Sequence, residues 1–163
     1  MAKRLTDGNT KATFVPAIAS ISAPSAGTEL TAAGIVALEN TVTDDGLDIS
    51  FDEGTVEGNV LASIQDFESP GRSKAQIELT YYRDSTAGSD RMWSVMTRGT
   101  AGFLVVRRGV TAATAYAAGQ KVEVYEVTCG ERRPMAPERE SYEKVQLKLY
   151  ASGTYSTEST VAA

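Results

Sequence analysis

Two stretches in which apolar and polar residues alternate constrain the fold of this chain more than any other feature. From Lys74 to Tyr81 the odd positions are small or apolar and the even positions are polar, and the stretch from Lys144 to Leu149 repeats this pattern. A period of two residues is typical of a strand that has one buried face and one face in water. The sequence therefore predicts a mainly β fold built from long β-hairpin ribs.

The length of 163 residues predicts a single domain over residues 1–163, large enough to bury a core without disulfide support. Residues 1–27 are expected to form a flexible N-terminal arm, apart from a short strand from Thr10 to Pro16. The polar end of the chain predicts a frayed C-terminal tail over residues 153–163. One short helix is expected from about Asp90 to Arg98.

The stretch over residues 53–71 is expected to be a long loop with apolar residues of its own. Their spacing would put four of them on one face of a helix, and long loops of this kind are often functional. Two interpretations stay open, because this face either covers the sheet of its own domain or contacts a neighbouring subunit. Together with two apolar residues of the first strand, the four make up the candidate subunit interface: Phe14, Val15, Val60, Leu61, Ile64 and Phe67.

The sequence lacks the residue groups that catalysis or metal binding usually needs. It has no histidine and one cysteine, Cys129, which excludes an internal disulfide and disfavours a zinc site. Nucleophile elbows, phosphate loops and dinucleotide-binding fingerprints are missing. The acidic residues around Asp44 do not have the spacing of a calcium loop and fit a solvated turn. We therefore expect a protein that is not an enzyme and that uses no cofactor or metal.

The balance of charges argues against a nucleic-acid-binding role. The 16 basic and 21 acidic residues give a net charge of −5, whereas phosphate binding requires a basic stripe. Arg107 and Arg108 are adjacent, and we expect them to pair with carboxylates such as Glu123 or Glu126 rather than to grip phosphate.

The start of the chain has basic residues but not the apolar region of a secretory signal. No stretch reaches the ~18 apolar residues that a membrane helix requires. We therefore expect a chain that is made in the cytoplasm and that has no membrane segment.

Five segments together carry a family resemblance. They are Met1 to Lys11, Thr43 to Leu47, Ala75 to Tyr81 with Arg83 and Asp84 after it, Arg98 to Gly109, and Ala117 to Tyr125. In these segments the chain resembles the major tail tube proteins of long-tailed, siphovirus-type bacteriophages that infect actinobacteria. The resemblance covers about residues 1–150 and depends on the overall pattern rather than on one motif.

This resemblance implies a β-sandwich or half-barrel flanked by one short helix, which joins a continuous β-barrel in the assembled ring. The implied rings are hexameric, and they stack into a tube around a tape-measure protein, with tail-tip and terminator proteins as further partners. Double-stranded DNA would pass through the bore without specific binding. The implied location is the virion tail, with assembly in the cytoplasm of the host cell.

The lining of such a bore has more than one possible source. An acidic protein suits a channel through which DNA slides, because a basic lining would hold the phosphates. The lining comes from the wet faces of the two ribs, which are not strongly acidic, or from other strands such as the one with Glu123, or the acidity lies outside the tube. The wet faces carry Lys74, Gln76, Glu78 and Thr80 on one rib and Lys144, Gln146 and Lys148 on the other.

Two alternative functions are also compatible with the sequence. A tail terminator or head-to-tail connector of similar fold would form one ring and stop. A carbohydrate-binding or receptor-binding β-sandwich would use a platform of exposed aromatic side chains. The candidate residues for that platform are Tyr81, Tyr82, Tyr116, Tyr125, Tyr142, Tyr150 and Tyr155.

Overall fold

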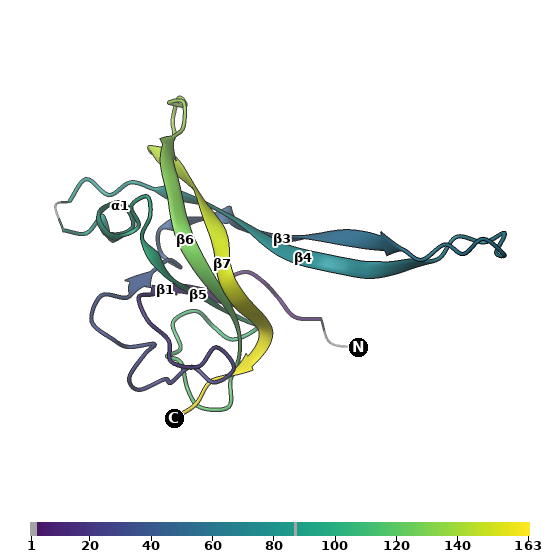
Figure 1. The fold of residues 1–163 in the computed structure, drawn as a ribbon. Helices are drawn as coiled ribbons and strands as arrows, with labels where there is room; N and C mark the ends of the chain where they lie inside the picture. The colour runs from purple at the N-terminus through teal and green to yellow at the C-terminus, as the bar shows by residue number, and fades with distance from the viewer. Residues whose placement is uncertain (1–2, 87) are drawn as a thin grey trace.

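A computed structural model describes residues 3–86 and 88–163, which form one antiparallel sheet of seven strands and one short helix (Figure 1). The first two residues of the expected N-terminal arm, Met1 and Ala2, lie outside the described residues. The sheet is open, with strand order β2-β1-β5-β6-β7-β4-β3. Its elements are β1 (Thr10–Val15), β2 (Val36–Ala37), β3 (Val42–Glu57), β4 (Glu68–Tyr82), α1 (Arg91–Val95), β5 (Ala101–Arg108), β6 (Lys121–Pro134) and β7 (Lys144–Thr160).

The main core lies on one face of this coiled sheet. The prediction from alternation is confirmed, because Ile77 and Leu79 of β4 and Leu147 of β7 are fully buried there. The same cluster includes Met92 and Met96, so that α1 packs on the core through one side. Each fully buried aliphatic side chain contributes about 1.5–3 kcal/mol to stability. The predicted mainly β fold with one short helix is therefore confirmed, although α1 is shorter than expected.

A second, smaller core lies on the reverse face of β1, β5 and β6. The connection over residues 16–35 covers this face, and Ile18 and Leu30 pack there against Val105 and Val124. This part of the expected N-terminal arm therefore lies on the body of the domain. Its Ala, Ser and Gly content is typical of a flexible segment, but a few apolar side chains suffice to dock it when an apolar sheet face is available.

The expected frayed tail is in fact the end of β7. Thr160 pairs with Lys121 of β6, and Val161 is 2% exposed. The hydroxyl of Ser159 donates a hydrogen bond to the carbonyl of Ile21 at 2.5 Å. A run of Ser, Thr and Gly gives little local signal for a strand, and here the pairing with β6 supplies the order.

Nearly half of the expected loop over residues 53–71 is strand. β3 and β4 continue through it as a hairpin, with Thr55 opposite Pro70 and Glu57 opposite Glu68, so that only residues 58–67 remain a loop. A Cβ atom on Gly71 would lie 2.8 Å from the carbonyl oxygen of Gly54, which shows how closely the two backbones approach. Neither glycine stands out as a strand residue in the sequence, because glycine is depleted in strands.

The outer half of this hairpin projects from the body (Figure 1). β4 pairs with β7 from Gln76 to Tyr82, and beyond that point its only strand partner among the described residues is β3. We call residues 51–74 the hairpin arm and residues 58–67 the arm tip. Of the helices in the described ranges, none is long and apolar enough to cross a membrane.

Candidate assembly surfaces

Two of the six candidate interface residues are inside the subunit. Phe14 is 1% exposed and Val15 is 0% exposed, and they point into the two different cores. β1 lies between β2 and β5, and both of its faces are covered, which explains why apolar residues are consecutive here. The structure therefore removes Phe14 and Val15 from the candidate interface.

The other four candidates lie at the arm tip, where they are exposed to solvent. Leu61 and Ile64 are 108% and 103% exposed, and Val60 and Phe67 are more than half exposed. The helix that their spacing suggested does not form, because the chain turns back here to join β3 to β4. Whether this tip contacts another subunit stays a prediction, but all four of its apolar side chains are more than half exposed.

Hydrogen bonds give the arm tip a defined shape. The backbone N–H of Gly58 donates to the carbonyl of Phe67 at 2.8 Å, and the N–H of Phe67 donates to Oδ1 of Asn59 at 3.1 Å. The N–H of Ser63 donates to the carbonyl of Val60 at 3.0 Å. The tip is thus a closed loop that holds Leu61 and Ile64 outward on a fixed backbone.

The root of the arm is fixed by aromatic contacts. The ring of Phe51 in β3 lies 5.4 Å from that of Tyr155 and 6.4 Å from that of Tyr125. The Tyr155 hydroxyl also makes a short hydrogen bond with the Ser73 hydroxyl. Since Tyr155 belongs to β7 and Tyr125 to β6, these contacts tie the arm to the body where β4 leaves the sheet.

A polar sheet face lies opposite the main core on β3, β4 and β7. Glu78 stands between Asp48 of β3 and Lys148 of β7, and it accepts a hydrogen bond from Nε2 of Gln146 at 3.3 Å. Positive and negative charges are mixed on this face, and all of its side chains are at least partly exposed. The residues of the polar sheet face are Asp48, Ser50, Asp52, Lys74, Gln76, Glu78, Thr80, Gln146, Lys148 and Tyr150.

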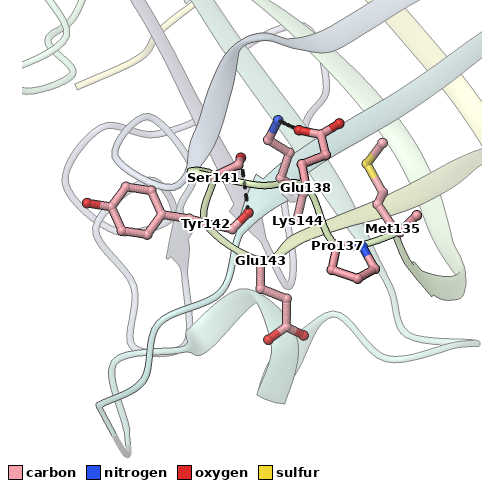
Figure 2. A pocket seen from close by; sticks show the side chains of 8 residues that line it. Met135, Pro137, Glu138, Ser141, Tyr142, Glu143 and Lys144 are labelled. Atoms are coloured by element: carbon pink, nitrogen blue, oxygen red, sulfur yellow. Dashed lines mark hydrogen bonds and ion pairs between the residues drawn. The ribbon is translucent and has the colours of Figure 1, made fainter.

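The turn between β6 and β7 forms a pocket of about 440 Å³, shown in Figure 2. Nζ of Lys144 lies 3.0 Å from Oε2 of Glu138 across the turn, and this hydrogen bond raises the pKa of Lys144. Tyr142 is 79% exposed and packs edge-on against Tyr82 at 5.8 Å between ring centroids. We call this the hairpin pocket; its lining residues are Met135, Ala136, Pro137, Glu138, Ser141, Tyr142, Glu143 and Lys144.

The two adjacent arginines of β5 have different partners. Nε of Arg108 lies 2.8 Å from Oε1 of Glu123, so the predicted cross-strand ion pair is confirmed for Arg108. For Arg107 the prediction is wrong, because successive strand residues point to opposite faces. Arg107 is fully buried, and its guanidinium donates to Gln120 Oε1 and to three loop carbonyls, those of Thr111, Thr114 and Ala115, at 2.8–2.9 Å.

A further cluster holds α1 against the sheet. The guanidinium carbons of Arg83 and Arg132 lie 3.8 Å and 3.9 Å from the ring centroid of Trp93. Nε of Arg83 also pairs with Oδ2 of Asp90 at 2.5 Å. Sequence reasoning missed this arrangement, because its members are far apart in the chain and no local pattern connects them.

The seven tyrosines do not gather into one platform. Tyr81 and Tyr125 are buried, Tyr116 is bonded to Thr13, and Tyr82 packs against Tyr142. The glycan-binding alternative therefore loses the surface on which it depended.

The described residues include neither an exposed thiol nor a cluster of metal ligands. Cys129 is buried, and this burial raises the pKa of its thiol to about 11. Within residues 3–86 and 88–163, no three His, Cys, Asp or Glu side chains are grouped so as to hold a metal ion. The distinctive features of this molecule are therefore its surfaces and its open sheet edges.

Comparison with known proteins gives one family match. A family model described as phage tail tube protein matches residues 1–163, which is the whole chain. No curated protein matches the sequence.

Proposed function

Since this chain belongs to the phage tail tube protein family, we propose that it assembles into hexameric rings that stack into the tail tube of a long-tailed phage. Its function is structural, as a component of the tube. The proposal adds three points to the family membership: the sixfold symmetry of the ring, a siphovirus-type phage with an actinobacterial host, and the absence of catalysis. Assembly would take place in the host cytoplasm, with tape-measure, tail-tip and terminator proteins as partners.

The observation that carries this proposal is the open sheet. β3 presents an edge from Val42 to Glu57, and at the other side β2 covers β1 with only two residues. Free edges of this length promote uncontrolled association unless they are paired. Joining such sheets from subunit to subunit closes a barrel, which satisfies the edges and forms a ring at the same time.

We further infer that the polar sheet face lines the bore. The opposite face of β4 and β7 is the buried core, so on these two strands the polar sheet face is the one available to a channel. It carries three acidic side chains, those of Asp48, Asp52 and Glu78, against two lysines, Lys74 and Lys148, so it has no basic stripe. A wall of this kind gives passing DNA no row of cations to bind, so the duplex slides past.

Electron cryo-microscopy of the purified, concentrated protein tests the proposal. We expect hollow tubes of stacked sixfold rings, with Gln76 and Gln146 on the inner wall. Single rings that never stack would instead favour the terminator or connector function. A chain that stays monomeric even when tail tips are added as nuclei would contradict the tube assembly.

A further inference from the structure

The subunit has two projections that end in apolar residues, and they point in different directions. The hairpin arm and the β6–β7 hairpin diverge from the body, so that the arm tip and the turn between β6 and β7 of one subunit lie apart (Figure 1). The first ends in Leu61 and Ile64, which are fully exposed, and the second holds a pocket with Met135 and Tyr142 at its rim. Each projection therefore presents an apolar feature that its own domain leaves uncovered.

The arm tip has the properties of a segment that enters a pocket on another molecule. The hydrogen bonds of Gly58 and Ser63 already fix the loop, so a partner does not have to order it, and preorganisation of this kind favours binding. The tip and the strand residues that flank it are acidic. Between residues 57 and 68 the charged side chains are Glu57, Asp66 and Glu68, with no lysine or arginine.

The hairpin pocket has the size to receive such an insert. An engineered cavity of ~150 Å³ accommodates a benzene molecule, so a pocket of about 440 Å³ has room for two aliphatic side chains. Figure 2 shows Met135 and Pro137 on one side of it and Tyr142 on the other. The pocket thus offers apolar contacts on both sides of an entering side chain.

Two exposed arginines near the hairpin pocket can pair with the acidic arm tip. Three carboxylates of β6 and the turn after it are held in ion pairs: Glu131 with Arg98, Glu138 with Lys144, and Glu143 with Arg83. Arg133, near the end of β6, and Arg139, in the turn, are exposed, and no ion pair to either is found among the described residues. From Glu131 to Lys144 the chain carries four acidic and four basic residues, so the surroundings of the pocket are balanced in charge and these two arginines are available to carboxylates of another subunit.

Two other hollows fit the arm tip less well. A pocket of about 390 Å³ near β1 is lined by Asp7, Glu39 and Asp44, and its Arg108 is already paired with Glu123. Acidic walls of this kind repel an acidic insert. The third, of about 280 Å³ beside α1, is smaller and is lined mainly by polar residues of the loop over residues 83–90.

We propose that the arm tip of one subunit places Leu61 and Ile64 in the hairpin pocket of a second copy of this chain. The contact joins two different surfaces of identical molecules, and such head-to-tail contacts generate rings or open helical assemblies rather than isolated dimers. This proposal depends on the proposed function, because it names the partner surface for an assembly that the function requires.

Disulfide trapping between two single variants tests this contact. Leu61→Cys and Ser141→Cys both lie at exposed positions, and the native Cys129 is buried. The two variants are mixed, assembled into tubes, oxidised and separated on non-reducing gels. We expect a cross-linked dimer in the mixture and not with either variant alone, because a disulfide requires Cα atoms within ~7 Å of each other.

A matched control uses Thr157→Cys, which is exposed on β7 away from the pocket. Tubes in which L61C links to T157C, or fails to link to S141C, would overturn the proposed contact while the tube function stands. Wild-type protein that forms no tube would instead overturn the proposed function and this contact with it.

Substitution gives an independent test. The double variant Leu61→Asp with Ile64→Asp should melt within a few degrees of wild type but need at least a tenfold higher concentration to assemble. The control Thr157→Asp should assemble like wild type. Normal assembly of the double variant would overturn the proposal.

Discussion

The inner and outer halves of β4 differ in where their side chains lie, although they form one continuous strand. From Ala75 to Tyr81 every second side chain is fully buried, whereas from Glu68 to Lys74 every residue is at least partly exposed. The inner half has neighbours on both edges, β3 and β7, and the outer half pairs with β3 alone among the described strands. Because its side chains are buried, the inner half stabilises the fold, while the exposed outer half is free to make contacts between subunits.

The largest effect is expected from Ile77→Asp in the inner half. An unpaired charge in the core costs several kcal/mol, which is comparable to the total stability of a small domain of roughly 5–15 kcal/mol. We expect this variant to be unfolded or insoluble when measured by circular dichroism. Gln76→Asp, on the half-exposed side of the same strand, is the control and should fold normally. A folded I77D protein with a wild-type melting temperature would contradict the division between the two halves.

An intermediate effect is expected from Phe51→Ala at the root of the arm. The substitution removes two aromatic contacts, each worth about 0.5–1.5 kcal/mol, so the free energy of unfolding should fall by about 1–3 kcal/mol. Amide hydrogen exchange in residues 51–74 should rise more than exchange in β5. The control Val56→Asn, farther out on the exposed arm, should change stability by less than about 0.5 kcal/mol. Equal effects of the two changes would show that the aromatic root does not anchor the arm.

The smallest effect is expected from Tyr81→Phe at the end of the inner half. The Tyr81 hydroxyl is buried without a hydrogen-bond partner among the described residues, so its removal should leave stability unchanged or raise it by up to about 1 kcal/mol. Burial raises the pKa of Tyr81 from 10.0 to about 12. The unfolded chain therefore loses this proton first, and wild-type stability should fall as the pH rises from about 10 to 12.

Tyr81→Phe should make this alkaline loss of stability smaller in urea titrations at pH 9 and pH 11. Tyr142→Phe, which removes a tyrosine hydroxyl from an exposed position, is the matched control. An unchanged slope in Y81F would show that Tyr81 is not the group that titrates.

The parts of the fold that could be predicted from the sequence are those that have a local period. Alternation placed Ile77, Leu79 and Leu147 in the core correctly, because a half-buried strand needs that pattern. The arm strands and the end of β7 were missed, since their order comes from pairing with distant residues. Thr55 opposite Pro70 and Lys121 opposite Thr160 leave no periodic signal in either partner.

The candidate interface divides in the same way. Leu61 and Ile64 were expected on one face of a helix, which does not form, and the structure leaves them exposed, so their role in an interface stays a prediction. Phe14 and Val15 interrupt a polar stretch, but they are covered by segments that lie elsewhere in the sequence. The connection over residues 16–35 buries Val15, and the sequence of β1 alone does not predict this burial.

The two guanidinium groups around Trp93 have an optical consequence. Trp93 is the single tryptophan of the chain, so the indole fluorescence of the whole protein comes from one ring held between Arg83 and Arg132. Its emission wavelength and quenching then report on the contacts that hold α1 against Arg83 and Arg132. Each subunit thus carries an intrinsic fluorescent probe. Assembly that disturbs the α1 side of the domain would shift the tryptophan emission, and no added label is needed to detect it.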